Sequence, residues 1–454
     1  MDAAFALARN AVNTGYEQLP AEVVAVTRVS ILDTIGVMLA ASTVGEGVKE
    51  MVELAREAGG KEESSVIAFG GKLPAMMAAF ANGSMGHPLD YDDTHDAAVV
   101  HPTAATLPAA LAVSELTGKT SGKEFITAIA LGNDLVCRLG LAANHNPGWL
   151  TPQTFGVFGA AMSAARILRL NEDQMLSALG IAYHQASGNM EASYQTGSVL
   201  RAIRDGFTAK AGVLSALMAR KGLTGVKSIF ETRAGLYNLY FRGDYDPAPL
   251  TEGLGKTFEC TNVSFKPWPA RRDTHAYIEA TISIMRENSI APKDIDVITV
   301  IGDVQSLCEP LEARRKPARA IDAKVSLPFT VALAVMRGKL MIADFLPENL
   351  KSEPVLEMAR HVEYRQALSS GVKGLGSGEV EMKTRSGKVY TKKVNFAYGH
   401  PKNPISRADL TEKFRDCATY SAKPLSAGQV DDIINLVGNL ESLDDISQVI
   451  RLIS

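Results

Sequence analysis

The sequence has few cysteines, no strong charge imbalance and no long apolar run at its start. Its four cysteines are far apart and form no CxxC pair, so we expect neither a zinc site nor a disulfide framework, and a reducing, cytoplasmic setting. A formal net charge of -3 provides no overall field that would attract nucleic acid. The first residues lack the basic start of a signal peptide, and apolar runs such as 37–41 are too short for a bilayer, which needs about 20 residues. We therefore expect neither nucleic acid nor a membrane as a partner.

What the sequence does contain is a series of alanine-rich helical patterns. With 454 residues, 46% of them hydrophobic and 21% charged, the chain has ordinary globular composition and is long enough for two or three domains. Apolar residues recur at helical spacing from Ile31 to Leu39, and similar patterns follow over 105–118, 123–140, 158–170 and 207–222. These patterns predict a large helical domain whose first part covers 1–264.

After this first part the residue pattern changes from helical periodicity to patterns typical of strands. Residues 295–304 form a β-branched run, and residues 378–396 alternate on both sides of a Ser-Gly turn, as a hairpin should. A further helical pattern lies between them, so we predict a smaller α+β domain over 265–399. Residues 400–454 are helical again and are expected to return to the large domain. The predicted fold is mainly α with an inserted α+β lobe, and the large domain contains both termini.

The segment 82–105, NGSMGHPLDYDDTHDAAVVHPTAA, brings together three of the eight histidines and four aspartates. Imidazoles and carboxylates suit zinc, iron or manganese, but the spacing matches no metal motif such as HExxH. A second interpretation is structural, because Asp and Thr accumulate in turns and at helix starts, where their side chains bond to backbone N–H groups.

The same segment resembles the MmgE/PrpD family, which includes 2-methylcitrate dehydratase, cis-aconitate decarboxylase and iminodisuccinate epimerase. Further stretches carry the resemblance: LDTIGVMLAAS (32–42), GWLTPQTFGVFGAAMSAARIL (148–168), RDGFTAKAGVLSALMARKGLTG (204–225), FKPWPARRDTHAYIEA (265–280) and AKVSLPFTVALAVMRGKL (323–340). The resemblance implies a large helical domain with both termini, a smaller α+β domain, a homodimer, and catalysis without a metal or another cofactor.

Members of this family move a proton at a carbon next to a carboxylate, which requires a base together with fixed positive charge. By resemblance, His101, Asp90, Thr94 and Lys266 occupy active-site positions. His101 is the leading acid/base candidate, and Asp90 is expected to orient or tune its imidazole. Thr94 is expected to hydrogen-bond a substrate carboxylate, and Lys266 to bind one or donate a proton; the alternative for Lys266 is a solvated charge before a proline turn.

Other positions depart from the family pattern. Leu150 stands where many members have a histidine, Phe329 where the decarboxylase has a tyrosine, and Arg271 where it has another histidine. Arg201 and Arg204 stand near a family lysine and histidine. Arginine binds carboxylates in a two-pronged way but does not release its proton, so these changes favour substrate binding over proton transfer. For Arg271 the alternative is a surface position or an ion pair with an aspartate two residues away.

The sequence therefore leaves three candidate functions. The first is a cofactor-independent, dehydratase-like lyase that acts on a small di- or tricarboxylate. The second is an isomerase or epimerase of a small dicarboxylate, because moving a proton without expelling a group needs fewer catalytic groups. The third is a catalytically weakened family member that binds polycarboxylates.

Overall fold

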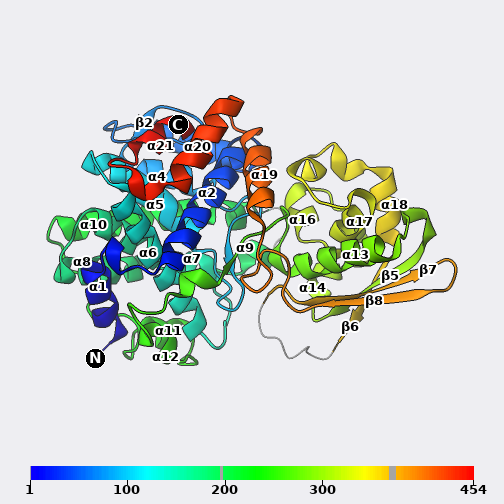
Figure 1. Ribbon diagram of the computed structural model, residues 1–454. Coiled ribbons are helices and arrows are strands. Elements are labelled where there is room, and N and C mark those ends of the chain that lie inside the picture. The colour runs from blue at the N-terminus through cyan, green and yellow to red at the C-terminus, as the bar shows by residue number, and fades with distance from the viewer. Residues whose placement is uncertain (1, 195–197, 368–374) are drawn as a thin grey trace. The chain divides into compact units, whose positions relative to one another are not determined.

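The structure is a computed structural model that describes residues 2–194, 198–367 and 375–454, and the chain divides into two compact units (Figure 1). The helical unit consists of Met1–Pro88, Asp92–Val263 and Thr411–Ser454, and the α+β unit of Leu89–Tyr91 and Ser264–Leu410. With 58% of residues helical and 9% in strands, the predicted class, mainly α with a smaller α+β part, is confirmed.

The sequence analysis placed the domain boundaries after 264 and after 399. The compact units change at residues 263/264 and 410/411, and the second change falls inside helix α19 (Arg407–Ala418). The tripeptide 89–91, which lies in the middle of the predicted helical part, belongs to the α+β unit.

The helical unit is built from helices of very different length. Its long helices are α1 (Ala3–Asn13), α2 (Ala21–Val44), α3 (Val48–Glu57), α4 (Ala75–Gly83), α5 (Pro102–Thr117), α6 (Gly122–Ala142), α7 (Thr151–Ile167), α8 (Glu172–Gln185), α10 (Leu200–Arg220) and α20 (Ala427–Gly438). Its short elements are α9 (Glu191–Tyr194), α11 (Leu236–Tyr240), α12 (Ala248–Thr251), α21 (Ser447–Ile453), β1 (Ser64–Ser65), β2 (Lys72–Leu73) and β3 (Thr94–His95).

Helices α2 and α6 are 24 and 21 residues long and apolar enough to cross a membrane by length and composition. Their most apolar stretches are, however, 78% and 94% buried inside the protein. Alanine-rich helices pack closely around them, so burial in a protein core accounts for their apolar character. Ser121 caps the start of α6 by accepting from the backbone N–H of Glu124, and the Glu124 carboxylate accepts from the Ser121 N–H in return.

The C-terminal helices pack on the first part of the helical unit, α20 against α2 and α21 against α5 (Figure 1). A buried ion pair joins Lys413 of α19 to Asp33 of α2 with 2.6 Å between Nζ and Oδ1. Arg28 of α2 donates to the carbonyl of Gly438 and pairs with Glu441. The C-terminal segment is therefore held by polar bonds as well as by apolar contacts.

The α+β unit contains a four-stranded sheet in the order β6 (Val362–Gln366), β5 (Ile295–Gly302), β7 (Gly378–Thr384) and β8 (Val389–Val394). Strands β5 and β6 are parallel, and the other pairs are antiparallel. The predicted hairpin is β7–β8, and its turn contains Gly387 at a φ of +87°, a value that glycine adopts without strain.

Three helices, α13 (His275–Asn288), α17 (Leu327–Arg337) and α18 (Glu353–Arg360), pack with the sheet into one apolar core (Figure 1). Shorter elements complete the unit: α14 (Gln305–Cys308), α15 (Leu311–Arg315) and α16 (Ala320–Lys324), while β4 (Val263–Ser264) lies where the chain passes from one unit to the other.

All four cysteines are buried as free thiols, two of them, Cys137 and Cys260, in the core of the helical unit. Burial raises the pKa of both thiols well above its usual range. Because the thiolate is the reactive form, these residues are inert parts of the core.

Candidate functional site

The segment 84–101 connects α4 to α5 in a series of turns, and most of its polar side chains are buried. His101 is the last residue before α5, and Pro102 begins the helix at a position where proline costs no hydrogen bond. Asp90 and Val99 have φ values of +51° and +53°, which are strained for residues with a β-carbon. The surrounding structure therefore holds this segment in a conformation that its residues do not prefer.

Two imidazoles of the helical unit share one carboxylate. Nδ1 of His87 lies 2.9 and 3.0 Å from the two carboxylate oxygens of Asp92, and Nδ1 of His101 lies 3.2 Å from Oδ2 of the same residue. The ring centroids of His87 and His101 are 4.6 Å apart. Asp92 is fully buried and so is His87, whereas the side chain of His101 is 12% exposed.

These contacts fix the tautomer of His101. Its Nδ1 also lies 2.9 Å from the carbonyl oxygen of Asp93 and 3.1 Å from Oγ1 of Thr94. Carbonyl and carboxylate oxygens can only accept, so Nδ1 must carry the proton, and Nε2 is then the basic nitrogen of the neutral ring. The same argument makes Nδ1 of His87 a donor to Asp92. Each ring is thus oriented as a general base is in other enzymes, with a carboxylate behind it.

His87, Asp92 and His101 are also a group that could hold a divalent cation, because one ligand atom from each lies within 4.8 Å of the others. The structure therefore contains a group of side chains that could form the metal site considered in the sequence analysis. Asp92 already accepts a hydrogen bond from Nδ1 of His87 and lies 3.2 Å from Nδ1 of His101, so a cation bound through these nitrogens would have to displace two Nδ1 protons. The expectation of a metal-free site stays a prediction.

Asp93 begins a buried chain of hydrogen bonds beneath His101. Its carboxylate accepts from Oγ1 of Thr103 at 2.5 Å and from the backbone N–H of Thr103 at 3.3 Å. Asn133 of α6 donates to Oγ1 of Thr103 at 2.8 Å and accepts from Oγ1 of Thr106 at 2.6 Å. Burial raises the pKa of Asp93 to about 7, with the charge of Asp92 acting in the same direction and the Thr103 hydroxyl opposing it. These hydrogen bonds fix Asp93, whose backbone carbonyl accepts a hydrogen bond from Nδ1 of His101.

Lys266 and Asp90 lie together in the α+β unit. The Lys266 ammonium is fully buried, donates to the Asp90 carbonyl at 2.9 Å and lies 3.9 Å from Oδ1 of the same residue. The hydroxyl of Tyr91 donates to the carbonyl of Pro267, which ties the two segments together a second time. Lys266 is thus not a solvated charge.

The predicted arginines have different surroundings. Arg201 is partly buried on the first turn of α10, where its carbonyl accepts from Nη1 of Arg204. Arg204 is buried beside Asp205. Arg271 is partly exposed and pairs with Asp273 at 3.0 Å, which is the alternative that the sequence left open.

Two residues that replace family side chains have structural positions. Leu150 is buried immediately before α7. Phe329 is buried in α17 within the core of the α+β unit.

The sequence analysis missed two members of the cluster. It counted Asp92 and His87 only among the carboxylates and imidazoles of the segment 82–105, without an active-site role for either. Both lie in the segment that drew attention, and their spacing of five residues was the available signal. Asp93 anchors the start of α5 by accepting from the backbone N–H of Thr103.

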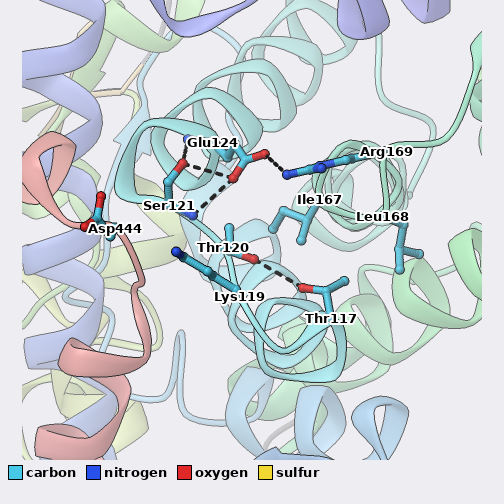
Figure 2. A pocket seen from close by; sticks show the side chains of 9 residues that line it. All are labelled: Thr117, Lys119, Thr120, Ser121, Glu124, Ile167, Leu168, Arg169 and Asp444. Carbon is cyan, nitrogen blue, oxygen red and sulfur yellow. Dashed lines mark hydrogen bonds and ion pairs between the residues drawn. The ribbon is translucent and has the colours of Figure 1, made fainter.

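The helical unit also has a surface pocket of about 550 Å³, which Figure 2 shows. Its polar groups bond to one another: Glu124 pairs with Arg169 and with the Ser121 cap, and Thr117 bonds to Thr120. No predicted site residue lines this pocket. We attribute the pocket to the junction of helix ends and assign no chemistry to it.

Comparison with known proteins identifies the class to which this fold and cluster belong. Residues 6–248 match the MmgE/PrpD N-terminal domain, and residues 268–439 match the MmgE/PrpD C-terminal domain. The chain therefore belongs to the MmgE/PrpD family.

Among curated proteins, the chain is 29% identical to the cis-aconitate decarboxylase of Homo sapiens, over 84% of this chain and 80% of the human protein. It is 27% identical to the cis-aconitate decarboxylase of Aspergillus terreus, over 86% and 83%. It is also 27% identical to the cis-aconitate decarboxylase-like protein oryM of Aspergillus oryzae, over 86% and 84%.

Proposed function

We propose that the protein is a lyase that acts on a small di- or tricarboxylate by removing a proton from a carbon next to a carboxylate, in a dehydratase-like reaction without a metal or another cofactor. The single observation that carries the proposal is the orientation of His101, whose Nδ1 faces Asp92 and the Asp93 carbonyl. The similarity to cis-aconitate decarboxylases supports a lyase of small carboxylates.

His101 is the proposed base. As its Nε2 takes up a proton, the ring becomes positively charged, and the buried carboxylate of Asp92 stabilises that charge at 3.2 Å. Thr94 holds Nδ1 from another side. A correctly placed general base accelerates proton transfer on the order of 10² to 10⁴-fold, so the loss of His101 should lower turnover by that factor.

Positive charge must accompany the base, because the intermediate carries an extra negative charge next to the substrate carboxylates. Lys266 is the leading candidate in the α+β unit, where its buried ammonium donates to the Asp90 carbonyl. Arg201 is the candidate on α10. Arg204 and Arg271 are less suited, because each already lies beside an aspartate.

One observation favours an isomerase or epimerase as the second candidate. An epimerase needs proton carriers on two faces of the reacting carbon, and the cluster contains two imidazoles, His87 and His101, whose Nδ1 atoms both face Asp92. The dehydratase-like proposal remains first because only His101 is partly exposed.

Proton NMR in deuterated water tests the proposal directly. The purified protein is incubated with methylcitrate, citrate, cis-aconitate, malate, tartrate and iminodisuccinate, beside His101→Ala and a control, His184→Ala, whose exposed imidazole lies on α8. A new vinyl signal that His101→Ala loses and His184→Ala keeps would support the lyase. Exchange of the α-proton alone would make the protein an isomerase, and binding without either change would favour the weakened, polycarboxylate-binding member.

A further inference from the structure

Residues 95–100 form a closed turn directly before His101. The backbone N–H of His95 donates to the carbonyl of Val100 at 3.0 Å, and the N–H of Val99 donates to the carbonyl of His95 at 2.9 Å. His101 follows Val100 in the chain, so the turn determines where the backbone of His101 lies. The position of the proposed base therefore depends on the contacts that hold this turn closed.

The side chain of His95 belongs to the turn and is only 5% exposed. Its Nδ1 accepts from the backbone N–H of Ala98 at 3.1 Å. A backbone N–H can only donate, so this Nδ1 carries no proton, and the proton of the neutral ring is on Nε2. Nε2 lies 3.7 Å from Oε2 of Glu259 in the 3₁₀ helix Glu259–Asn262. The imidazole thus closes the turn on one side and faces a carboxylate on the other.

Glu259 is held in place by α6. Its backbone N–H donates to Oδ1 of Asp134 at 2.5 Å. Oδ2 of Asp134 accepts in turn from Nε of Arg138 at 2.7 Å, and both of these α6 residues are buried. The carboxylate that His95 faces is therefore fixed to the core of the helical unit.

Helices α6 and α7 contact the other side chains and carbonyls of the turn. A β-carbon on Gly140 of α6 would lie 2.7 Å from the carbonyl oxygen of Ala98, so only glycine permits this approach. Oγ1 of Thr151, the first residue of α7, donates to the carbonyl of Val99 at 2.9 Å. Val99 has the strained φ of +53° and is 45% exposed. Because Val99 gains little from burial, the hydrogen bonds of the turn must stabilise its conformation.

We propose that His95 is a positioning residue for the base: by accepting from Ala98, its ring holds the turn in the strained conformation that orients the imidazole of His101. This inference deepens the proposed function and rests on it. Loss of the bond to Ala98 would let the backbone at Val99 relax to a negative φ, which would displace His101 without removing it. The expected consequence is slower proton transfer with little change in substrate binding.

The test compares three replacements of His95 in the full chain, with the reaction found for the wild type. His95→Asn places an amide oxygen close to the position of Nδ1 and keeps the acceptor for Ala98. His95→Gln is equally polar but carries its amide one carbon further out, and His95→Ala has no acceptor. We expect kcat to fall about ten- to a hundredfold in His95→Gln and His95→Ala with KM almost unchanged, and His95→Asn to recover most of this loss. The control His184→Ala, on the exposed surface of α8, should change neither constant.

Amide hydrogen exchange without substrate gives a second readout, measured by mass spectrometry on peptides that cover 96–101. Exchange in this segment should be faster in His95→Gln than in the wild type, and close to the wild type in His95→Asn. If the Asn and Gln variants have the same kcat, or if exchange over 96–101 is the same in His95→Gln as in the wild type, the inference is wrong.

Folding and the proposed function are checked separately. Circular dichroism reports folding, and the comparison of His95→Asn with His95→Gln is sufficient if His95→Ala does not fold. Because hydrogen exchange needs no turnover, a wild type that converts none of the acids but shows the expected order of exchange would reject the lyase and retain the role of His95 in holding His101.

Discussion

Replacing Asp93 by asparagine should change the stability of the helical unit in opposite directions at low and high pH. Burial raises the pKa of this carboxyl group from an ordinary value of 3.8 to about 7. Between these values the folded protein keeps a proton that the unfolded chain has released. The folded state then binds more protons, so the free energy of unfolding falls as pH rises through this window.

The magnitude follows from the size of the window. From pH 5 to pH 8 the folded carboxyl group stays protonated for about two pH units, which corresponds to a loss of about 3 kcal/mol. Asparagine cannot ionise, but its NH₂ group replaces one of the two oxygens of Asp93 that accept separately from the hydroxyl and the backbone N–H of Thr103. That deficit should make Asp93→Asn less stable than the wild type at pH 5 by about 1 kcal/mol. At pH 8 the variant should be more stable by about 2 kcal/mol, because the buried charge is gone.

The assay is urea unfolding at pH 5 and pH 8, followed by tryptophan fluorescence. The chain has two tryptophans, Trp149 in the helical unit and Trp268 in the α+β unit, so a Trp268→Phe background makes the signal report the helical unit. Asp173→Asn, on the exposed surface of α8, is the control and should show no such change of sign. If the stability difference between Asp93→Asn and the wild type is the same at both pH values, the proposed proton on Asp93 does not exist.

Three further changes test other parts of the helical unit. Lys413→Met leaves the Asp33 carboxylate buried beside an apolar side chain, and should lower the free energy of unfolding by about 3 to 5 kcal/mol in urea titrations. Ser121→Ala removes the cap of α6 and should lower the melting temperature through a loss of about 1 kcal/mol. Asn133→Ala removes the donor to Thr103 and should lower kcat of the reaction found for the wild type more than it changes KM, because it loosens the support of the base. If Asn133→Ala changes KM and leaves kcat unchanged, the hydrogen bond from Asn133 does not support the base.

The sequence predicted the fold class because the relevant signals are local. Helical periodicity identified several of the long helices, and alternation around a Ser-Gly turn identified the β7–β8 hairpin, whose Gly387 has a positive φ. The tripeptide 89–91 could not be assigned in this way. Its place in the α+β unit depends on the bond from Lys266 to Asp90, which joins residues 176 positions apart in the chain.

In the candidate site, too, local sequence signals could be interpreted, whereas contacts set by the folded chain could not. The sequence singled out the segment and His101, but it could not show that Asp92 faces the imidazole, because turns with positive φ break the side-chain alternation that would allow such an inference. For Arg271 the partner was visible, since Asp273 is two residues away.

The cost of the segment 84–101 also bears on its purpose. Among the residues that the structure describes, six non-glycine residues have positive φ, and two of them, Asp90 and Val99, lie in this segment. Each such conformation costs about 1 to 3 kcal/mol, and a buried carboxylate such as Asp93 adds a further penalty above its pKa. A segment that only connected α4 to α5 would avoid these costs with glycine and neutral side chains. Because local strain and buried charge persist mainly where function requires them, the cost itself favours a chemical role for His87, Asp92 and His101 over the interpretation of this segment as a structural turn.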